Sequence, residues 1–251
     1  MFSAVHVPRD PATAQQALRD GGTVLAGGTY LMPRFNERAF PPTSLVSLRH
    51  VGLDTVDVDG GAVTIGAATT LATLEADERL AFLRPCLRAI ASPPVRSLAT
   101  IGGNLFVPQP YGDLAVALLA LDASVERYGS PTVPLQAFLD DRIDGLVTAV
   151  TFTAPDEFRF YKATRRRHNS AAIVTVATAG DRIALGGVAP RPLRAHAAEA
   201  ALRDRELTGA AVADAADAMR EHLAPADDAY ASAWYRRRVF PVHLRRALLG
   251  R

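Results

Sequence analysis

Helix-spaced and strand-like apolar runs alternate from the start of the chain. Apolar residues at helical spacing follow Asp10-Pro11 and stop at Gly21-Gly22, which predicts a short capped helix with a glycine stop. Residues 23–26 then predict a short buried strand that runs into Gly27-Gly28-Thr29, and residues 45–48 predict another strand. The chain therefore begins as an α/β unit.

The middle of the chain predicts antiparallel strands joined by helices. Segments 55–58 and 62–66 flank Asp59-Gly60-Gly61, which is the turn chemistry of a β-hairpin. The other expected elements are a helix over 71–83, a glycine- and proline-rich loop over 100–112, an apolar helix over 114–121 capped by Asp113, and strands over 124–128 and 146–152.

A second region begins after Ala154-Pro155-Asp156-Glu157, where a proline and two acids separate two strand patterns. We expect a domain boundary there, with domains at 1–155 and 156–251. The second domain is predicted to hold three antiparallel strands, over 158–162, 171–177 and 182–188, and amphipathic helices over 193–205, 210–223 and 230–249. Pro241 predicts a break or kink in the last helix.

Composition narrows the classes of function. The chain has 28 basic and 26 acidic side chains, and this near balance gives no case for nucleic acid as a partner. A single cysteine, Cys86, excludes an intramolecular disulfide, a tetracysteine zinc site and an iron–sulfur cluster on this chain. The sequence shows neither an export signal nor an apolar run long enough to span a membrane, so we expect a cytoplasmic protein.

Two glycine-containing segments share a design that suits a diphosphate: Ala26-Gly27-Gly28-Thr29 and Thr100-Ile101-Gly102-Gly103-Asn104. Paired glycines let the backbone approach a ligand, and successive amide groups can form a concave anion site. The alternative is that each glycine pair only marks a turn. Neither segment is a G-x-G-x-x-G or a P-loop, which disfavours a nicotinamide-binding Rossmann domain.

Other candidate sites give weaker signals. Six scattered histidines show no metal-ligand spacing, and we expect no metal site. We interpret the arginine triplets 165–167 and 236–238 as domain-packing or subunit contacts, or as solvated surface. Asp140-Asp141 is expected in a loop turn, and Cys86 as a small buried apolar residue. No catalytic residue is assigned.

Ordered motifs along nearly the whole chain resemble those of one protein family. They are residues 24–29 (VLAGGT), 92–105 (SPPVRSLATIGGNL), 111–113 (YGD), 118–123 (LLALDA), 160–162 (FYK) with Arg166-Arg167, 186–190 (GGVAP) with Arg194, and Ser232 with 235–237 (YRR). Together they resemble the FAD-binding medium subunit of molybdenum hydroxylases, the xanthine dehydrogenase and carbon monoxide dehydrogenase family.

The resemblance implies a fold and a set of cofactor contacts. The fold would be α+β: a two-lobed FAD-binding domain of the vanillyl-alcohol-oxidase type, with lobes at about 1–53 and 54–155, and then a small α+β domain. The implied FAD-binding residues are Ala26, Gly27, Gly28, Thr29, Tyr30, Thr100, Ile101, Gly102, Gly103, Asn104, Asp113, Val147 and Lys162.

Three of these residues have particular implied roles. Asp113 would contact the adenosine ribose or a neighbouring polar group, and Lys162, the only lysine, would lie near the flavin ring. Val147 would contribute backbone. Two positions depart from the family pattern: Tyr30 replaces a small polar residue, so only its backbone role carries over, and Ser170 replaces a common acid.

The implied function is that of a flavoprotein subunit in an enzyme complex. A large subunit would hold molybdopterin, a small subunit would hold two [2Fe–2S] clusters, and electrons would pass through FAD on this chain to NAD⁺, a quinone or oxygen. The alternatives are a stand-alone FAD-dependent oxidase or dehydrogenase, and a flavin-free assembly or scaffold subunit. An NAD-only dehydrogenase is opposed by the missing fingerprint.

Overall fold

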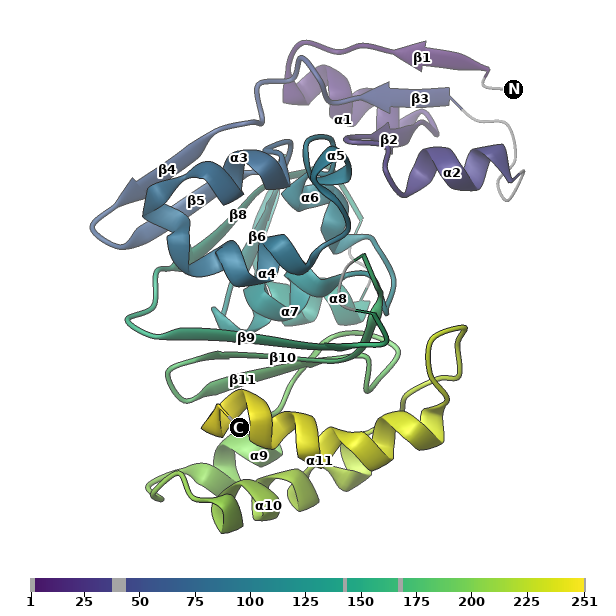
Figure 1. The fold of residues 1–251 in the computed structure, drawn as a ribbon. Helices are drawn as coiled ribbons and strands as arrows, with labels where there is room; N and C mark the ends of the chain where they lie inside the picture. Colours follow the sequence, from purple (N-terminus) through teal and green to yellow (C-terminus); the bar gives the residue numbers. More distant parts are fainter. Residues whose placement is uncertain (1–2, 38–43, 142–143, 167–168, 251) are drawn as a thin grey trace.

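Three β-sheets organise the chain in a computed structural model that describes residues 3–37, 44–141, 144–166 and 169–250. Figure 1 shows the sheets one above another, with the two ends of the chain at opposite ends of the molecule. Arg167, one of the residues that carry the family resemblance, lies outside the described residues.

The first sheet is small and parallel. Its strands β1 (Ala4–His6), β3 (Ser44–Ser47) and β2 (Thr23–Leu25) lie in that order, with α1 (Pro11–Arg19) and α2 (Leu31–Asn36) between them in the chain. The predicted first helix is confirmed, and the Asp10 carboxylate caps it by accepting the Thr13 N–H at 2.8 Å. The strands predicted at 23–26 and 45–48 are confirmed as β2 and β3.

The second sheet is antiparallel, with strands in the order β4-β5-β8-β6-β7. The predicted hairpin is confirmed as β4 (Val56–Asp59) and β5 (Ala62–Gly66), and the later predicted strands as β6 (Ser124–Arg127) and β8 (Val147–Thr153). Strand β7 (Ser130–Pro134) and helix α8 (Leu135–Asp141) were not predicted. Asp140-Asp141 therefore ends a helix, and the expected loop turn is wrong.

Short helices cover this sheet: α3 (Leu71–Ala76), the 3₁₀ turn η1 (Glu78–Leu83), α4 (Arg84–Ala89), α5 (Pro93–Arg96) and α6 (Ile101–Leu105). The single helix expected over 71–83 is divided at Asp77, whose extended backbone ends α3 and whose carboxylate caps η1. The loop expected over 100–112 is also wrong in its first part, because Thr100 caps α6 through the Gly103 N–H.

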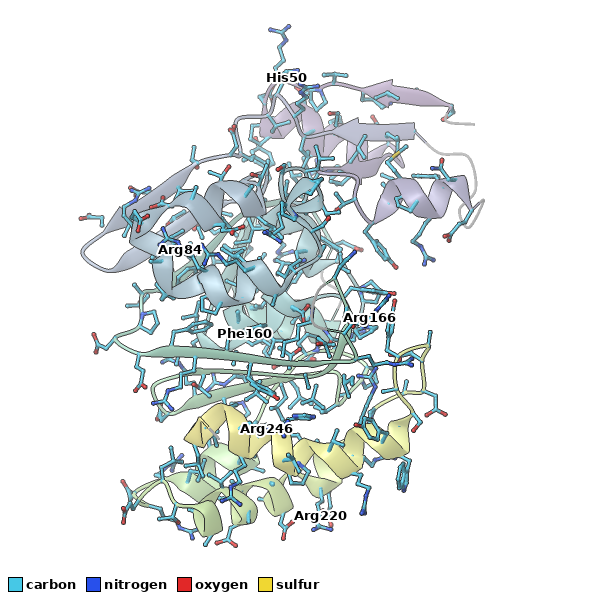
Figure 2. All side chains as sticks on the ribbon, viewed as in Figure 1. His50, Arg84, Phe160, Arg166, Arg220 and Arg246 are labelled. Atoms are coloured by element: carbon cyan, nitrogen blue, oxygen red, sulfur yellow. The ribbon has the colours of Figure 1, made fainter. Side chains whose placement is uncertain are left out.

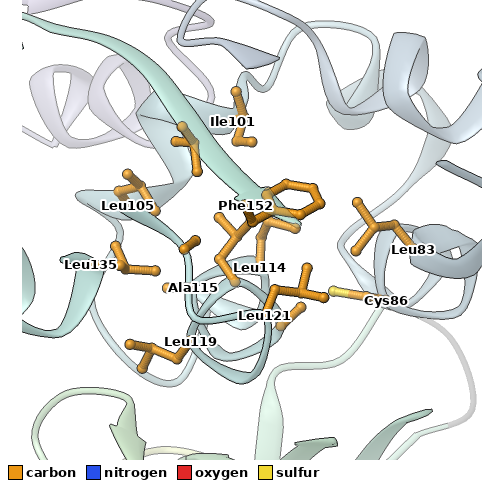
Figure 3. Close-up of a cluster of buried hydrophobic side chains, with 14 of the residues drawn as sticks. Leu83, Cys86, Ile101, Leu105, Leu114, Ala115, Leu119, Leu121, Leu135 and Phe152 are labelled. Atoms are coloured by element: carbon orange, nitrogen blue, oxygen red, sulfur yellow. The ribbon is translucent and has the colours of Figure 1, made fainter. Parts of the chain in front are cut away.

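Helix α7 (Asp113–Ala120) lies between the second sheet and the third, and all eight of its residues are buried. A helix that is apolar all round needs partners on every side, and this position supplies them. Figure 3 shows α7 side chains such as Leu114 and Leu119 within a buried cluster that also contains Cys86 and Phe152. Cys86 is fully buried, as predicted. The expected cap is wrong, because Gly112 takes the N-cap position and Asp113 is the first helical residue.

The third sheet has four strands, whereas three were predicted: β12 (Leu193–Arg194), β11 (Arg182–Gly186), β10 (Ala172–Ala179) and β9 (Phe158–Thr164). The extra strand is a two-residue segment that the sequence pattern placed in a helix. Figure 1 shows α9 (His196–Leu202), α10 (Gly209–Ala218) and α11 (Ala233–Leu249) on the face of this sheet opposite α7, and the 3₁₀ turn η2 (Arg220–His222) follows α10.

Helix α11 continues through Pro241, so the expected break is absent. Proline removes the N–H that would bond the carbonyl four residues earlier, here that of Arg237. Arg237 and Pro241 both lie on the exposed side of α11, where water can satisfy that carbonyl. Among the described residues, no helix is both long and apolar enough to cross a lipid bilayer.

Candidate functional site

The two glycine-containing segments meet in space although they are far apart in sequence. A Cβ atom added to Gly27 would lie 1.9 Å from the carbonyl oxygen of Leu98, and one added to Gly103 would lie 3.9 Å from the Cβ of Ala26. Only glycine allows the first approach, because no real side chain survives such a clash. The turn after β2 therefore packs directly against the segment that leads into α6.

The turn formed by residues 26–30 presents unused backbone donors. Gly28 has a φ of +69°, a conformation that glycine adopts without strain. Within the described part of the chain, no hydrogen bond is donated by the backbone N–H groups of residues 27–30, whereas the Gly28 carbonyl accepts the Met32 N–H at 2.9 Å. All five residues are half-buried. Successive free amides in a partly enclosed turn suit an anionic ligand.

The backbone donors of α6 are already used, which corrects the expectation that both segments offer amides. The N–H of Ile101 donates to Thr69, that of Gly102 to Ala67, and that of Gly103 to the Thr100 hydroxyl, at 3.0, 2.9 and 3.1 Å. These bonds hold α6 against the chain that precedes α3. The segment can contribute close backbone approach to a ligand, but no further amide from these three residues.

Asn104 supplies the polar atom that α6 leaves without a partner. Asn104 is 7% exposed, and among the described residues no donor reaches its buried Oδ1. A buried carbonyl oxygen with no donor costs stability unless a ligand or water satisfies it. Together, the free amides after β2, the contact that requires glycine and this buried acceptor fit a bound dinucleotide with both an anionic group and hydrogen-bond donors.

Tyr30 begins the approach to α2, where it takes the N-cap position without a side-chain capping bond. The Arg34 guanidinium carbon lies 5.4 Å from the centre of its ring, a cation–π contact. The tyrosine ring therefore has a role in local packing that the small polar residue typical of the family could not fill.

Asp113 and Lys162 bind each other. The lysine Nζ lies 2.7 Å from Asp113 Oδ2 and also donates to the Ala89 carbonyl at 2.8 Å, while the Thr175 hydroxyl donates to Asp113 Oδ1 at 3.0 Å. The side chains are 4% and 7% exposed. Burial raises the pKa of Asp113, against the opposing effect of Lys162. The pair joins α7 to β9 and β10, and both carboxylate oxygens already have partners.

Val147 is connected to α6 through two residues, Thr148 and Ala67. It begins β8, and the next carbonyl, that of Thr148, accepts the Ala67 N–H at 2.9 Å, while the Ala67 carbonyl accepts the Gly102 N–H. The structure thus connects Val147 to the glycine segment by backbone bonds. Its own side chain is 5% exposed.

Sequence reasoning missed a polar contact between Tyr111 and Tyr230, whose hydroxyl oxygens lie 2.7 Å apart. Nothing local predicts it, because the two residues are 119 positions apart. Two open hollows of about 390 and 400 Å³ lie away from the glycine segments. The hollow of about 390 Å³ is lined by Gln136, Asp140, Leu193, Arg194, His196, Ala197, Met219 and His222. No group of three potential metal ligands occurs among the described residues.

A parallel lobe and an antiparallel lobe that meet at a glycine turn, followed by an α+β domain, define a two-lobed nucleotide-binding protein of the flavin type. The chain belongs to the family described as FAD binding domain in molybdopterin dehydrogenase, which matches residues 1–152. A second family, the CO dehydrogenase flavoprotein C-terminal domain, matches residues 159–250. The family resemblance and the fold class inferred from the sequence are confirmed, apart from the fourth strand.

Relatives match along most of their length. The glyceraldehyde dehydrogenase medium chain of Sulfolobus acidocaldarius is 29% identical over 91% of this chain and 92% of its own. The carbon monoxide dehydrogenase medium chain of Afipia carboxidovorans is 32% identical, with coverage of 97% and 94%. The carbon monoxide dehydrogenase structure from Hydrogenophaga pseudoflava that lacks the Mo-pyranopterin moiety superposes with a TM-score of 0.91, at 28% identity, covering 99% of this chain and 96% of that one.

Proposed function

We propose that this chain is the FAD-carrying medium subunit of a molybdenum hydroxylase complex and relays electrons from the [2Fe–2S] clusters of a partner subunit to a terminal acceptor. The observation that carries the proposal is the half-buried turn over residues 27–30, whose backbone amides have no acceptor among the described residues and which packs on α6. Bound FAD would supply the redox chemistry, and the chain would bind and orient it.

Different groups of the site would bind different parts of FAD. The amides of residues 27–30 would hold the diphosphate, because successive N–H groups stabilise an anion without a charged side chain. Gly103 would let the cofactor lie against the backbone of α6, which Gly102 holds close to Ala67, and Asn104 Oδ1 would accept a hydrogen bond from the cofactor.

The cofactor contacts that the family resemblance implies for Asp113, Lys162 and Val147 are less direct, because the side chains of Asp113 and Lys162 already bind other groups of this chain. A ribose hydroxyl at Asp113 would have to share or displace the bonds from Lys162 and Thr175. We therefore propose that the ion pair mainly fixes β9 and β10 on α7. It would support the cofactor site through this packing and not by direct contact with the cofactor. Val147 would act through the backbone that leads to Gly102.

The cysteine content of this chain and the names of its relatives support the proposed complex. A single buried cysteine leaves no ligand set for an iron–sulfur cluster, so the clusters would sit on a small subunit and molybdopterin on a large one. The relatives named medium chain and FAD-binding subunit support this arrangement. NAD⁺ or another acceptor would take the electrons, and a cytoplasmic location fits a lone reduced thiol.

The first test is flavin binding. The purified full chain is expected to bind FAD and to show the visible absorption of a flavoprotein. Gly103→Val should abolish binding, because its side chain would enter the space between Thr100 and Ala26, whereas Gly209→Val, at the half-buried start of α10 far from the two glycine segments in sequence, should not. A wild-type chain that takes up no FAD, or a Gly103→Val variant with unchanged affinity, would overturn the proposed cradle.

A second test separates the complex from a stand-alone enzyme. The gene is co-expressed with its genomic neighbours, and reduction of bound FAD by candidate primary substrates is followed by absorbance. The relay requires that the isolated chain is not reduced by these substrates and that the assembled complex is. Turnover of a primary substrate by the isolated chain would favour an oxidase or dehydrogenase that acts alone.

A further inference from the structure

A segment of the C-terminal domain reaches back to the FAD-binding domain beside the cofactor site. The Tyr230 hydroxyl lies 2.7 Å from that of Tyr111, and the two rings meet edge to face with centroids 5.9 Å apart and planes at 89°. Tyr111 belongs to the connection between α6 and α7, and Tyr230 to the segment 227–232 that leads into α11. The contact therefore joins two domains directly after the α6 part of the cradle.

Hydrogen bonds within the C-terminal domain hold the segment 227–232 in place. Asp228 accepts the N–H groups of Tyr230 and Ala231 at 2.8 and 3.0 Å, and its other oxygen pairs with the Arg236 guanidinium at 2.5 Å. Arg236 is 1% exposed and also donates to the Gly187 carbonyl at 3.2 Å. A buried guanidinium with several acceptors is a rigid anchor, because its planar fork loses little freedom for each bond.

A second tie comes from the end of β9, where Arg165 Nη1 donates to the Ala229 carbonyl at 3.4 Å. Figure 2 shows the neighbouring Arg166 on the same side of the molecule as this segment. Contacts within its own domain therefore hold Tyr230 in place independently of Tyr111. Tyr230 can in this way determine where the Tyr111 ring lies.

Tyr30 connects this pair with the free amides. It directly follows Gly27-Gly28-Thr29 and lies close enough to Tyr111 to add to the rise in the pKa of that phenol. Tyr111 is 46% exposed and Tyr230 is half-buried, so each keeps an open side. Three tyrosines, one from each of the three sheet-containing bodies, therefore lie near one another beside the turn over residues 27–30.

We propose that Tyr230 is a positioning residue that holds Tyr111 as an aromatic wall at the open side of the flavin site and limits the access of solvent solutes to the bound cofactor. This inference rests on the proposed function, because it needs FAD in the cradle. In the described structure the two phenol hydroxyls bond to each other, and the role proposed for the pair rests on shape and position.

The experiment uses the full chain reconstituted with FAD. Fluorescence lifetime and iodide quenching of bound FAD are measured for wild type, Tyr230→Phe, Tyr230→Ala and the control Tyr128→Phe, which alters an exposed tyrosine at the turn between β6 and β7. Unfolding midpoints are recorded for each variant. Tyrosine rings close to a flavin quench its emission, so displacement of the wall lengthens the lifetime and exposes the cofactor to iodide.

The expected results are graded. Tyr230→Phe keeps the ring but loses the hydrogen bond. The ratio of displaced to seated Tyr111 should then rise by about fivefold, the change in an equilibrium constant that corresponds to one net hydrogen bond. Tyr230→Ala should increase lifetime and iodide quenching further, and Tyr128→Phe should match wild type.

Two results would overturn the inference for different reasons. Full FAD occupancy with unchanged lifetime and iodide quenching in Tyr230→Ala contradicts the wall, even if the unfolding midpoint falls, because the pair is then only a contact between domains. Failure of wild type to bind FAD overturns the proposed function itself and the inference with it.

Discussion

At the scale of single residues, the ion pair between Asp113 and Lys162 makes a strong prediction. Asp113→Asn should lower the free energy of unfolding by about 3–5 kcal/mol, because it leaves the buried lysine ammonium without its counter-charge. Denaturant unfolding followed by circular dichroism measures the loss.

The matched control is an exposed pair at the start of β9, the strand that carries Lys162: Arg159 with Glu157, whose side chains are 49% and 64% exposed. Glu157→Gln should cost about 0–1 kcal/mol, as is usual for solvated pairs. The double variant Asp113→Leu/Lys162→Met should recover most of the stability, because removing both charges also removes their desolvation cost. Equal losses for Asp113→Asn and Glu157→Gln would contradict a buried pair.

Tyr111 gives a prediction for alkaline pH. The hydrogen bond with Tyr230, followed by burial, raises the pKa of Tyr111 to about 12. An unfolded tyrosine titrates near pH 10, so the folded state holds this proton more tightly. The resulting stability is complete below about pH 10 and is lost as the pH rises towards about 12.

Tyr230→Phe should therefore lower the pKa of Tyr111 towards the ordinary value. A titration of tyrosinate absorbance measures the change, and Tyr128→Phe should remove one phenol from the titration without moving the late step. A late step that persists in Tyr230→Phe would show that the hydrogen bond is not its cause.

At the scale of elements, local pattern predicted most of the strands but missed β1, β7, β12 and the helix around Gly102. The β4–β5 hairpin was correct because its turn residues and alternating side chains are local signals. Two adjacent glycines argue against a helix at about 1 kcal/mol each relative to alanine, yet residues 101–105 form α6. The reason is tertiary: a Cβ on Gly102 would lie 2.8 Å from both the Cβ and the carbonyl oxygen of Ala67.

The same geometry predicts the effect of filling that space. Gly102→Ala should lower the free energy of unfolding by about 1–3 kcal/mol, since overpacking forces backbone to move. Gly209→Ala is the control: it stands at the first position of α10, and its Cβ would come no nearer than 3.4 Å to the Arg245 guanidinium.

The control substitution should be neutral or stabilise by about 0.5–1 kcal/mol, because alanine loses less entropy in a helix than glycine. Thermal unfolding of both variants measures the difference. If Gly102→Ala were as stable as Gly209→Ala, the close packing of α6 on Ala67 would be wrong.

At the scale of the whole molecule, order along the chain was predictable and contact between distant segments was not. The uniform apolar pattern of α7 indicated burial, but no local signal identified the sheet that covers its far side. The proposed cofactor segments stood out by their residues and family pattern, whereas the tie from Tyr230 to Tyr111 and the pairing of Lys162 with Asp113 depend on how the two domains dock.

That docking should make the chain unfold as one unit. Gly186 of β11 faces α7 across the domain interface, where an added Cβ would lie 2.6 Å from Val116 Cγ2 and 3.0 Å from Gln109 Oε1. In wild type, denaturant unfolding followed by Trp234 fluorescence, which reports on α11, and by circular dichroism should give one coincident transition.

Gly186→Val inserts a wedge at this interface and should lower stability by about 1–3 kcal/mol or more. Because the wedge acts between α7 and the third sheet, the tryptophan and circular dichroism transitions should separate, with the C-terminal domain losing structure first. Gly209→Val, a valine placed on the same domain away from α7, should keep the transitions coincident. Two separate transitions in wild type would contradict a shared core, and coincident ones in Gly186→Val would mean that the domains are held together mainly by contacts outside α7.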